Sequence, residues 1–284
     1  MDLKVVGAGR LGCRVAYLWK KKFPESKIYL KTRSNDANRS AKWKSLGFIP
    51  LSFEDDKNHI QAKFVLFSAP PSDNSSYTDD VQAAVLKDWI SSDGGKFVFT
   101  GSGSVYSENS GHTVHETSNV SRDKERQIVL LNTEDVVLKN GGLVLRFGGL
   151  YEMASRLINY WLSKEEKREI NSCPNGLINM IHYDDAARCI IKALLTSFES
   201  NNQLFLVSDG VPMSRQSICE AALKCPLYHS KILPTFLGDP SCIDGKQYQT
   251  SLVCNKLGWT PMFRSFAEFM EKSYDQELDM SSIV

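Results

Sequence analysis

The feature that most constrains this chain is a glycine-rich turn, "VVGAGRLG", at residues 5–12. It directly follows a short apolar run typical of a buried strand and opens a segment with helical spacing of apolar residues. Gly7, Gly9 and Gly12 have GxGxxG spacing, in which the first permits a tight turn, the second lets backbone approach a pyrophosphate and the third lets helix and strand pack closely. The pattern predicts a dinucleotide-binding loop, with a purely structural turn as the alternative. The residues expected to contact the cofactor here are Gly7, Gly9, Arg10, Leu11 and Gly12.

Apolar runs and helical patterns alternate from Leu3 to Phe147. Five runs are short, rich in Val, Phe, Leu and Ile, and bounded by turn residues, which is typical of strands buried on both faces: "LKVVGAG", "KIYLKT", "AKFVLFSA", "KFVFTG" and "GLVLRF". This predicts an α/β protein with a Rossmann-type, doubly wound parallel sheet.

The alternation of strand-like and helical patterns stops after Phe147, and this suggests how the chain divides into domains. We expect a dinucleotide-binding domain over 1–150, to which a further helix and strand in 181–210 return. A smaller substrate lobe would take up 151–180 and, with a C-terminal helix, 211–284. Ligands bind at the carboxyl ends of the strands in such folds, so the lobe would lie over that edge.

The end of the second predicted strand bears on the choice of cofactor. An NAD site usually has Asp or Glu about 20 residues after the glycine loop, to hold the ribose 2′-hydroxyl. This chain instead has "KTRSN", with Thr32, Arg33 and Ser34. Arg33 can pair with a 2′-phosphate through two N–H groups, and Ser34 can add a hydroxyl. The segment favours NADP over NAD, unless Arg33 is an ordinary solvated charge.

Composition excludes several classes of partner. The chain has 34 Lys and Arg against 33 Asp and Glu, a formal charge of +1, which gives no basic field for nucleic acid or an anionic bilayer. No apolar run reaches the roughly 18 residues of a membrane span. The seven cysteines show no metal-like spacing and indicate structural thiols in a reducing compartment.

A strand that begins almost at Met1 leaves no room for a signal peptide, so we expect a cytoplasmic protein that acts on a small molecule. A transit peptide trimmed before the first residue is the alternative.

Several motifs, taken in order, resemble the extended and atypical short-chain dehydrogenase/reductases, which are relatives of the nucleotide-sugar epimerases. The motifs that carry the resemblance are "GAGRLG", "FTGSGSVYSENSGHTVHETS", "LRFGGLYE", "MIHYDDAARCIIKAL" and "NKLGWTP". They span most of the chain. The resemblance implies a nicotinamide cofactor and an oxidoreductase or epimerase-like activity.

Matched to this family, Ser102 lies at the catalytic serine, which hydrogen-bonds a substrate carbonyl or hydroxyl; the alternative is that it only ends a strand. The family's YxxxK motif is missing, because Arg126 and Leu130 stand where its Tyr and Lys are expected. Spacing of four places Arg126, Leu130 and Glu134 on one helix face. Arg stays protonated and is no general acid, but it can clamp a carboxylate or stabilise an oxyanion.

Other candidates have more ordinary alternatives. Tyr106 is a candidate hydroxyl donor, although such a Tyr is usually a packing residue. His182 is expected to orient a loop, and His115 has no recognisable ligand partner. Small residues after two strands are expected to line the cofactor cleft, with plain turn chemistry as the alternative: Ser68, Ala69, Pro70, Phe147, Gly148 and Gly149.

Two hypotheses therefore remain for the function. One is an NADP-dependent oxidoreductase or epimerase-like enzyme that acts on a small carbonyl or hydroxyl substrate. The other is a non-catalytic NADP-binding redox sensor or assembly protein on the same scaffold, which the missing Tyr and Lys favour. A two-domain hydroxyacid or imine reductase is a third reading, but it requires a long helical second domain that the sequence lacks.

Overall fold

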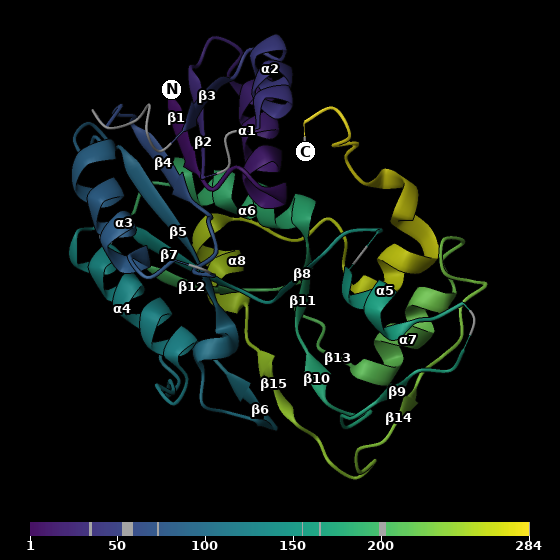
Figure 1. The fold of residues 1–284 in the computed structure, drawn as a ribbon. Coiled ribbons are helices and arrows are strands. Elements are labelled where there is room, and N and C mark those ends of the chain that lie inside the picture. Colours follow the sequence, from purple (N-terminus) through teal and green to yellow (C-terminus); the bar gives the residue numbers. More distant parts are fainter. Residues whose placement is uncertain are drawn as a thin grey trace.

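The computed structural model of the chain describes residues 1–33, 36–52, 59–72, 74–154, 156–164, 166–198 and 203–283. A seven-stranded parallel sheet forms its centre, in the order β12-β7-β5-β4-β1-β2-β3 (Figure 1). The strands of this sheet are β1 Leu3–Val6, β2 Ile28–Thr32, β3 Ile49–Ser52, β4 Phe64–Phe67, β5 Lys96–Ser102, β7 Leu143–Phe147 and β12 Leu204–Val207. The predicted Rossmann-type α/β fold is confirmed.

Helices cover both faces of the sheet, as a doubly wound fold requires. In Figure 1, α3 and α4 lie on one side, and α1, α2 and α6 on the other. Their bounds are α1 Arg10–Lys22, α2 Ala37–Ser45, α3 Tyr77–Ala83, α4 Glu125–Lys139 and α6 Tyr183–Leu195. After α3 the chain continues through one π-helical segment, Ala84–Asp88, before it enters β5.

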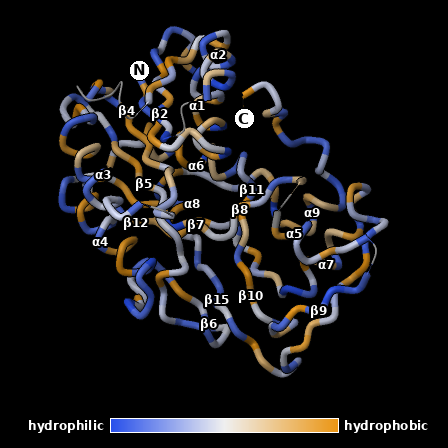
Figure 2. The backbone as a smooth tube through the Cα atoms, in the orientation of Figure 1, coloured by the Kyte–Doolittle hydropathy of each residue, from blue (hydrophilic) through white to orange (hydrophobic). Residues whose placement is uncertain are grey.

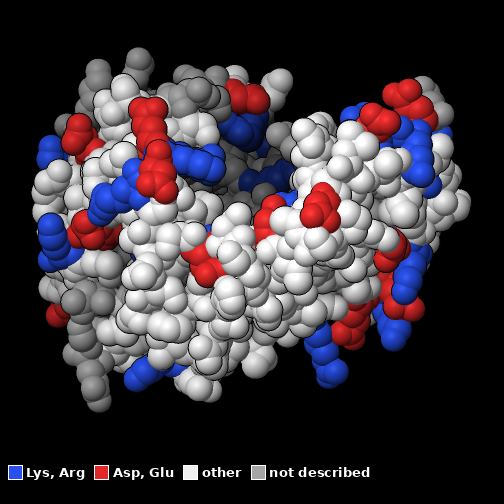
Figure 3. Space-filling view, turned by 90° about the horizontal axis from the view of Figure 1, so that it is seen from below, with Lys and Arg blue, Asp and Glu red and all other residues white. Residues whose placement is uncertain are grey.

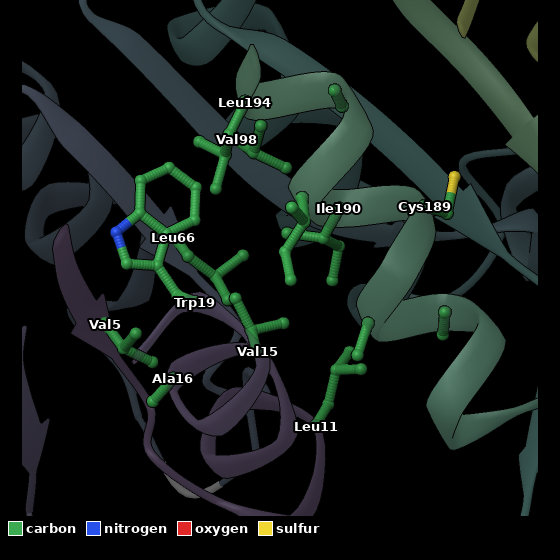
Figure 4. Close-up of a cluster of buried hydrophobic side chains, with 14 of the residues drawn as sticks. Val5, Leu11, Val15, Ala16, Trp19, Leu66, Val98, Cys189, Ile190 and Leu194 are labelled. Atoms are coloured by element: carbon green, nitrogen blue, oxygen red, sulfur yellow. The ribbon is translucent and has the colours of Figure 1, made fainter. Parts of the chain in front are cut away.

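The main core lies between the sheet and the pair α1 and α6. Figure 4 shows Val15 and Trp19 of α1 facing Ile190 and Leu194 of α6, with strand residues such as Leu66 beside them. All five side chains are fully buried. In Figure 2 the strands at the centre of the molecule are predominantly hydrophobic in colour, as expected for strands that contribute to this core. This core fixes the first turn of α1, and with it the glycine loop, against the sheet.

The remaining elements lie beside the carboxyl ends of the sheet strands. A small sheet has the order β13-β10-β15-β6, and two further pairs, β8–β11 and β9–β14, are parallel. The strand bounds are β6 Ser110–Val114, β8 Gly149–Tyr151, β9 Glu169–Ile170, β10 Leu177–Ile178, β11 Met180–His182, β13 Met213–Ser214, β14 Thr235–Phe236 and β15 Gly245–Tyr248. The helices here are α5 Arg156–Trp161, α7 Arg215–Leu223 and α9 Phe266–Glu268, whereas α8 Ser251–Leu257 packs on the main sheet.

Parts of the last third of the chain pack on the main sheet as well as beside it. β12 pairs with β7, and α8 contacts β12. Met280 and Ile283 are buried in the same core cluster as α1 and α6. The division into two domains stays a prediction. None of the helices in the described part of the chain is both long and apolar enough for a membrane span.

Candidate functional site

An open cavity of about 510 Å³ lies at the carboxyl ends of β1, β4, β5 and β7. The first turns of α1 and α6 and one face of α4 complete its wall. Twelve of the predicted site residues line it: Gly7, Gly9, Arg10, Leu11, Gly12, Ser68, Ala69, Pro70, Ser102, Arg126, Phe147 and Gly148. Figure 3 shows the molecule hollowed on this side, with Lys and Arg side chains in the hollow.

The three glycines of the first loop differ in what surrounds them. Gly7 has φ +91° and its missing side chain would collide with the backbone of Ala69. A Cβ on Gly12 would lie only 2.6 Å from the carbonyl oxygen of Gly7. Gly9 is different, because nothing lies within 4 Å of the place where its Cβ would be. Gly7 and Gly12 therefore shape the turn, while Gly9 leaves open space in front of the first turn of α1, where helix N–H groups favour an anion.

The loop after β4 forms the opposite wall of the cavity. The Ser68 hydroxyl donates to the carbonyl oxygen of Gly7 at 3.0 Å, which joins this loop to the glycine turn. The Tyr77 hydroxyl donates to the carbonyl oxygen of Ala69 at 2.8 Å. Burial raises the pKa of Tyr77, more than the charges of Arg126 and Arg33 lower it, so the phenol stays a neutral donor. The wall is thus held in one conformation before any ligand binds.

Arg33 lies at the end of β2, outside the residues that line the cavity. Its guanidinium is exposed and donates to the carbonyl oxygens of Pro70 and Ser72 at 3.4 and 3.3 Å. These bonds hold it beside the loop that follows β4. Thr32 ends β2 and is likewise absent from the cavity lining, and Ser34 lies outside the described residues. The arrangement leaves the cofactor choice as a prediction.

Ser102 ends β5 at the floor of the cavity. Its hydroxyl oxygen accepts the backbone N–H of Ser104 at 3.2 Å and so caps the short helical turn that follows β5. The same hydroxyl lies 2.9 Å from the exposed Ser104 hydroxyl. Ser102 is thus a half-buried polar group in contact with a second hydroxyl that reaches solvent.

Arg126 and Leu130 face the cavity from α4, as their spacing predicts. Arg126 is exposed, and within the described residues its guanidinium has neither a hydrogen-bond acceptor nor a carboxylate partner. Leu130 is 2% exposed and presents only methyl groups. No described residue that lines the cavity is a carboxylate, while Arg10 and Arg126 are cationic. The cavity therefore favours an anionic ligand.

Glu134, one turn further along α4, lies below the cavity floor and does not line it. Its carboxylate accepts from Arg146 of β7 at 2.6 and 3.0 Å, and both side chains are almost fully buried. Although burial alone lowers the pKa of Arg146, the Glu134 carboxylate raises it above its ordinary value. Gly101 passes directly over this pair, since a Cβ there would lie 2.5 Å from the Glu134 carboxylate. The ion pair therefore supports the strand end that carries Ser102.

Tyr106 does not lie in the site. It is 2% exposed, and its ring packs against the Arg146 guanidinium at 4.9 Å. Its hydroxyl points to the backbone oxygen of Glu116, at 3.5 Å. We therefore correct its assignment from hydroxyl donor to packing residue. Gly149 is also outside the cavity lining and starts β8, where its N–H donates to the carbonyl oxygen of Asn179 at 2.7 Å.

Sequence reasoning missed several residues of the site. Pro71, Thr100, Gly101, Leu150 and Tyr183 also line the cavity. Thr100 and Gly101 precede Ser102 on the same strand, so the strand pattern contained a signal for them. Tyr183 comes from a helix that begins over 170 residues after the glycine loop, and no local pattern identifies it.

A buried ionic network beside the cavity was also missed. Arg14, one turn into α1, is 2% exposed and donates to Asp184 at 2.8 Å, Glu152 at 2.9 Å and Glu277 at 3.2 Å. Arg10, which lines the cavity, also pairs with Glu152. The His182 ring accepts the backbone N–H of Asp184 at 3.1 Å and so caps the first turn of α6. The network ties the first turn of α1 to β8, α6 and the C-terminal segment.

Comparison with known proteins gives the fold an independent test. No protein-family model matches the chain, and no curated protein matches it significantly. Solved structures do. UDP-glucuronic acid 4-epimerase from Bacillus cereus, in complex with NAD, superposes with a TM-score of 0.73 at 16% identity, over 97% of this chain and 96% of the other.

Two further structures are equally similar. dTDP-glucose 4,6-dehydratase from Bacillus anthracis str. Ames, in complex with NAD, has a TM-score of 0.72 at 13% identity, over 98% of this chain and 97% of that one. A functionally unknown conserved protein from Silicibacter pomeroyi has a TM-score of 0.74 at 15% identity, over 97% and 98%. The chain therefore shares the fold of these proteins. At such identities the likeness establishes the fold, and the chemistry has to come from the site.

Proposed function

We propose that this chain binds a nicotinamide dinucleotide along the glycine loop and uses it to reduce or oxidise a small substrate that carries an anionic group. The observation that carries the proposal is one cavity in which the open space at Gly9, the Ser102 hydroxyl and the Arg126 guanidinium face the same volume. A pyrophosphate at Gly9 would leave the far end of the dinucleotide near the carboxyl end of β5, where Ser102 lies. The similar structures solved with NAD support the cofactor class.

We further propose NADP as the preferred cofactor. The support is Arg33, which is exposed, lies at the end of β2 and is held beside the loop of the cavity wall. A 2′-phosphate there would gain a charge-assisted hydrogen bond, and neither Thr32 nor Arg33 is the Asp or Glu that usually follows this strand in NAD sites. The similar structures were solved with NAD, which favours the other cofactor. Titration with NADPH and with NADH compares the two directly.

The chemistry assigned to the protein side is electrostatic. A bound nicotinamide supplies or accepts hydride. The Ser102 hydroxyl donates to the substrate oxygen, and the Arg126 guanidinium stabilises the negative charge that develops on that oxygen or holds a substrate carboxylate. Because Arg126 stays protonated, the proton reaches the substrate oxygen from solvent through the paired hydroxyls of Ser102 and Ser104.

A non-catalytic NADP-binding protein on this scaffold is the second candidate. The observation that favours it is Leu130, whose methyl groups line the cavity where the short-chain dehydrogenase/reductases, which the sequence resembles, have a lysine. Without that cation at position 130 and with Arg126 in place of the tyrosine, α4 lacks the family's usual proton donor. Ligand binding would then alter the contacts of the protein without turnover.

The decisive experiment compares Arg126→Ala with Arg122→Ala. Arg122 precedes the same helix, is exposed and pairs with Asn132 and Asp135, so it is a matched control. If the proposal holds, cofactor affinity is unchanged in both variants. Turnover in a panel of carboxylate-bearing carbonyls and nucleotide sugars falls about 10²–10³-fold in Arg126→Ala only, the scale of one lost oxyanion donor. Arg126→Lys should recover only part, because it keeps the charge and loses the fork.

The same assay separates the two candidates. Turnover at the wild-type rate in Arg126→Ala would contradict the anchoring role. Tight cofactor binding with no turnover of any substrate by the wild type would favour the second candidate. Arg126→Tyr combined with Leu130→Lys then tests for lost catalysis, since carbonyl reduction gained by this variant would indicate that only the proton donor is missing.

A further inference from the structure

Two segments that lie far apart in the sequence run side by side beside the small sheet. The backbone N–H of Gly238 donates to the carbonyl oxygen of Ser172 at 3.1 Å, and the N–H of Leu177 donates to that of Asp244 at 2.7 Å. The Asn175 side chain donates to the carbonyl oxygen of Pro240 at 2.6 Å. These bonds recur along both segments, so residues 172–177 and 238–245 are held in one register.

An arginine from α7 clamps the two segments together. Arg215 donates to the carbonyl oxygen of Cys173 at 3.1 Å and to both carboxylate oxygens of Asp244, the second at 3.1 Å. It therefore binds one segment through a bidentate ion pair with Asp244 and the other through a single hydrogen bond to Cys173, which restricts their relative movement. The backbone around Cys173 is fixed from both sides.

Cys173 and Cys242 face each other within this clamp. Cys173 is 6% exposed, and its thiol contacts the carbonyl oxygen of Cys242. Cys242 is exposed, and both cysteines are free thiols. The Cys173 thiol touches the backbone of Cys242 and is hydrogen-bonded with the Cys242 thiol, so the two sulfurs are already neighbours.

We propose that Cys173 and Cys242 form a site of reversible oxidation, in which a peroxide converts the two thiols into an intramolecular disulfide. The exposed Cys242 reacts first: its sulfur displaces water from hydrogen peroxide and becomes a sulfenic acid. The Cys173 thiol then attacks that sulfur, the S–S bond forms and a second water leaves. In sum two thiols and one hydrogen peroxide give one disulfide and two waters, and a small thiol reverses the step by exchange.

The surroundings of Cys242 set how fast this happens. The hydrogen bond with the neighbouring Cys173 thiol raises the pKa of Cys242 most, with smaller contributions from burial and from the negative charges of Asp244 and Asp239. Less thiolate is then present at neutral pH, so oxidation is slow there and accelerates roughly tenfold per pH unit as the pH rises. The site would respond to sustained peroxide exposure.

The link would fix structure next to the cavity. The segment after Cys173 leads through β10 to Asn179, whose carbonyl oxygen lies against Gly148. The segment after Cys242 leads into β15 and Tyr248, whose hydroxyl lies against Gly103, the residue after Ser102. A disulfide between the two segments would therefore restrain both walls of the hollow from behind.

The test is peptide mapping of the folded, full-length chain after treatment with hydrogen peroxide. Remaining thiols are alkylated, the chain is digested without reductant, and linked peptides are identified by mass spectrometry. We expect two of the seven thiols to disappear, a peptide linking Cys173 to Cys242, a monomeric mass and a raised Tm; dithiothreitol should restore all seven. The linkage does not depend on any cofactor, so it can fail or succeed separately from the proposed function.

Cys254→Ser is the matched control, because Cys254 is half-buried in α8, away from the clamp. It should oxidise as the wild type does, whereas Cys242→Ser and Cys173→Ser should each lose the linked peptide and the rise in Tm. Four results would overturn the proposal: no thiol loss, a Cys242 sulfinic acid beside a free Cys173, a link between two chains, or a Cys189–Cys254 peptide in place of the expected one.

Discussion

At the scale of single residues, different glycines of the first loop serve the fold and the ligand. Gly7 has a positive φ and no room for a side chain, so its role is structural. Gly9 has φ −88° and ψ −158°, which any residue can adopt, and open space where its Cβ would lie. A side chain at position 9 would therefore meet the ligand and little else.

This difference gives the first prediction. Gly9→Val should fold with a Tm close to that of the wild type and bind no dinucleotide, because its side chain fills the space for the pyrophosphate. Gly7→Val should lose stability instead, by roughly 1–2 kcal/mol for the backbone alone and more for the contact with Ala69. Thermal unfolding and calorimetric titration with NADPH check both, and normal binding by Gly9→Val would contradict the assignment of the loop.

Arg33 carries the second prediction. Arg33→Ala should weaken NADPH binding by about 1.5–3 kcal/mol, the value of a hydrogen bond to a charged group, and NADH binding hardly at all. Lys44→Ala is the control, since Lys44 is an exposed cation on the neighbouring helix α2. Titration of both variants with both cofactors decides, and equal losses for NADPH and NADH would remove the contact with the 2′-phosphate.

At the scale of elements, the contact between α4 and β7 depends on one buried ion pair. Glu134 and Arg146 are both nearly inaccessible, and each would be left as an isolated buried polar group without the other. Removing one member of such a pair is costly because the remaining charge has lost its partner inside the protein.

The third prediction tests this contact. Glu134→Gln should destabilise the chain by roughly 3–5 kcal/mol, whereas Glu134→Gln with Arg146→Met should cost clearly less, because no unpaired charge remains. Glu125→Gln, an exposed change in the first turn of the same helix, should be nearly neutral. Urea unfolding measures all three, and a double variant as unstable as Glu134→Gln would show that the cost does not come from the isolated Arg146.

The elements also show what the sequence could and could not reveal. The helical segment expected directly after the glycine loop is α1, and the helix expected in 181–210 is α6, because a buried apolar stripe is a local property with a fixed period. The edge strand β3 and the pairing of β6 with β15 were not predicted. The latter joins residues 110 and 245, and such short pairs are stabilised by contacts that no local window contains.

The same limit applies to the site. Strand ends and the glycine spacing predicted eleven of the lining residues, because in a parallel sheet the carboxyl ends meet at one edge, and helix spacing predicted Arg126. The direction of the Tyr106 side chain could not be predicted, since it is fixed by Arg146, forty residues later in the chain. The network of Arg14 with Glu152 and Glu277 is equally non-local.

At the scale of the whole molecule, the C-terminal segment connects elements from both ends of the chain. Glu277 pairs with Arg14 of α1, and the N–H of Leu278 donates to Asp184 of α6 at 2.8 Å. Ile283 accepts from the Trp43 indole of α2 at 2.8 Å and is itself buried. The described end of this segment, up to Ile283, is therefore part of the core, and its packing is coupled to that of the glycine turn.

Asp209, directly after β12, makes the stability of the whole molecule depend on pH. It is 8% exposed; one oxygen accepts the N–H of Val211 at 2.9 Å, and the backbone N–H of Phe266 also interacts with the carboxylate. Burial is the main reason that its pKa rises from 3.8 to about 7, although the backbone hydrogen bonds from Val211 and Phe266 oppose the shift. The folded chain thus binds this proton more tightly than the unfolded chain does.

The fourth prediction follows from that difference. Since the folded pKa is the higher one, the contribution of Asp209 to stability is fully present below about pH 4 and is lost as the pH rises to about 7, by at most about 4 kcal/mol. Asp209→Asn keeps an oxygen for Val211 and cannot ionise, so it should be more stable than the wild type at pH 8 and similar to it at pH 4. Asp275→Asn, at an exposed position, should follow the wild type throughout. Urea unfolding of the three proteins at both pH values measures this. If the difference in free energy of unfolding between Asp209→Asn and the wild type is the same at pH 4 and at pH 8, the carboxylate is already ionised at pH 4 in the folded chain, and the prediction is wrong.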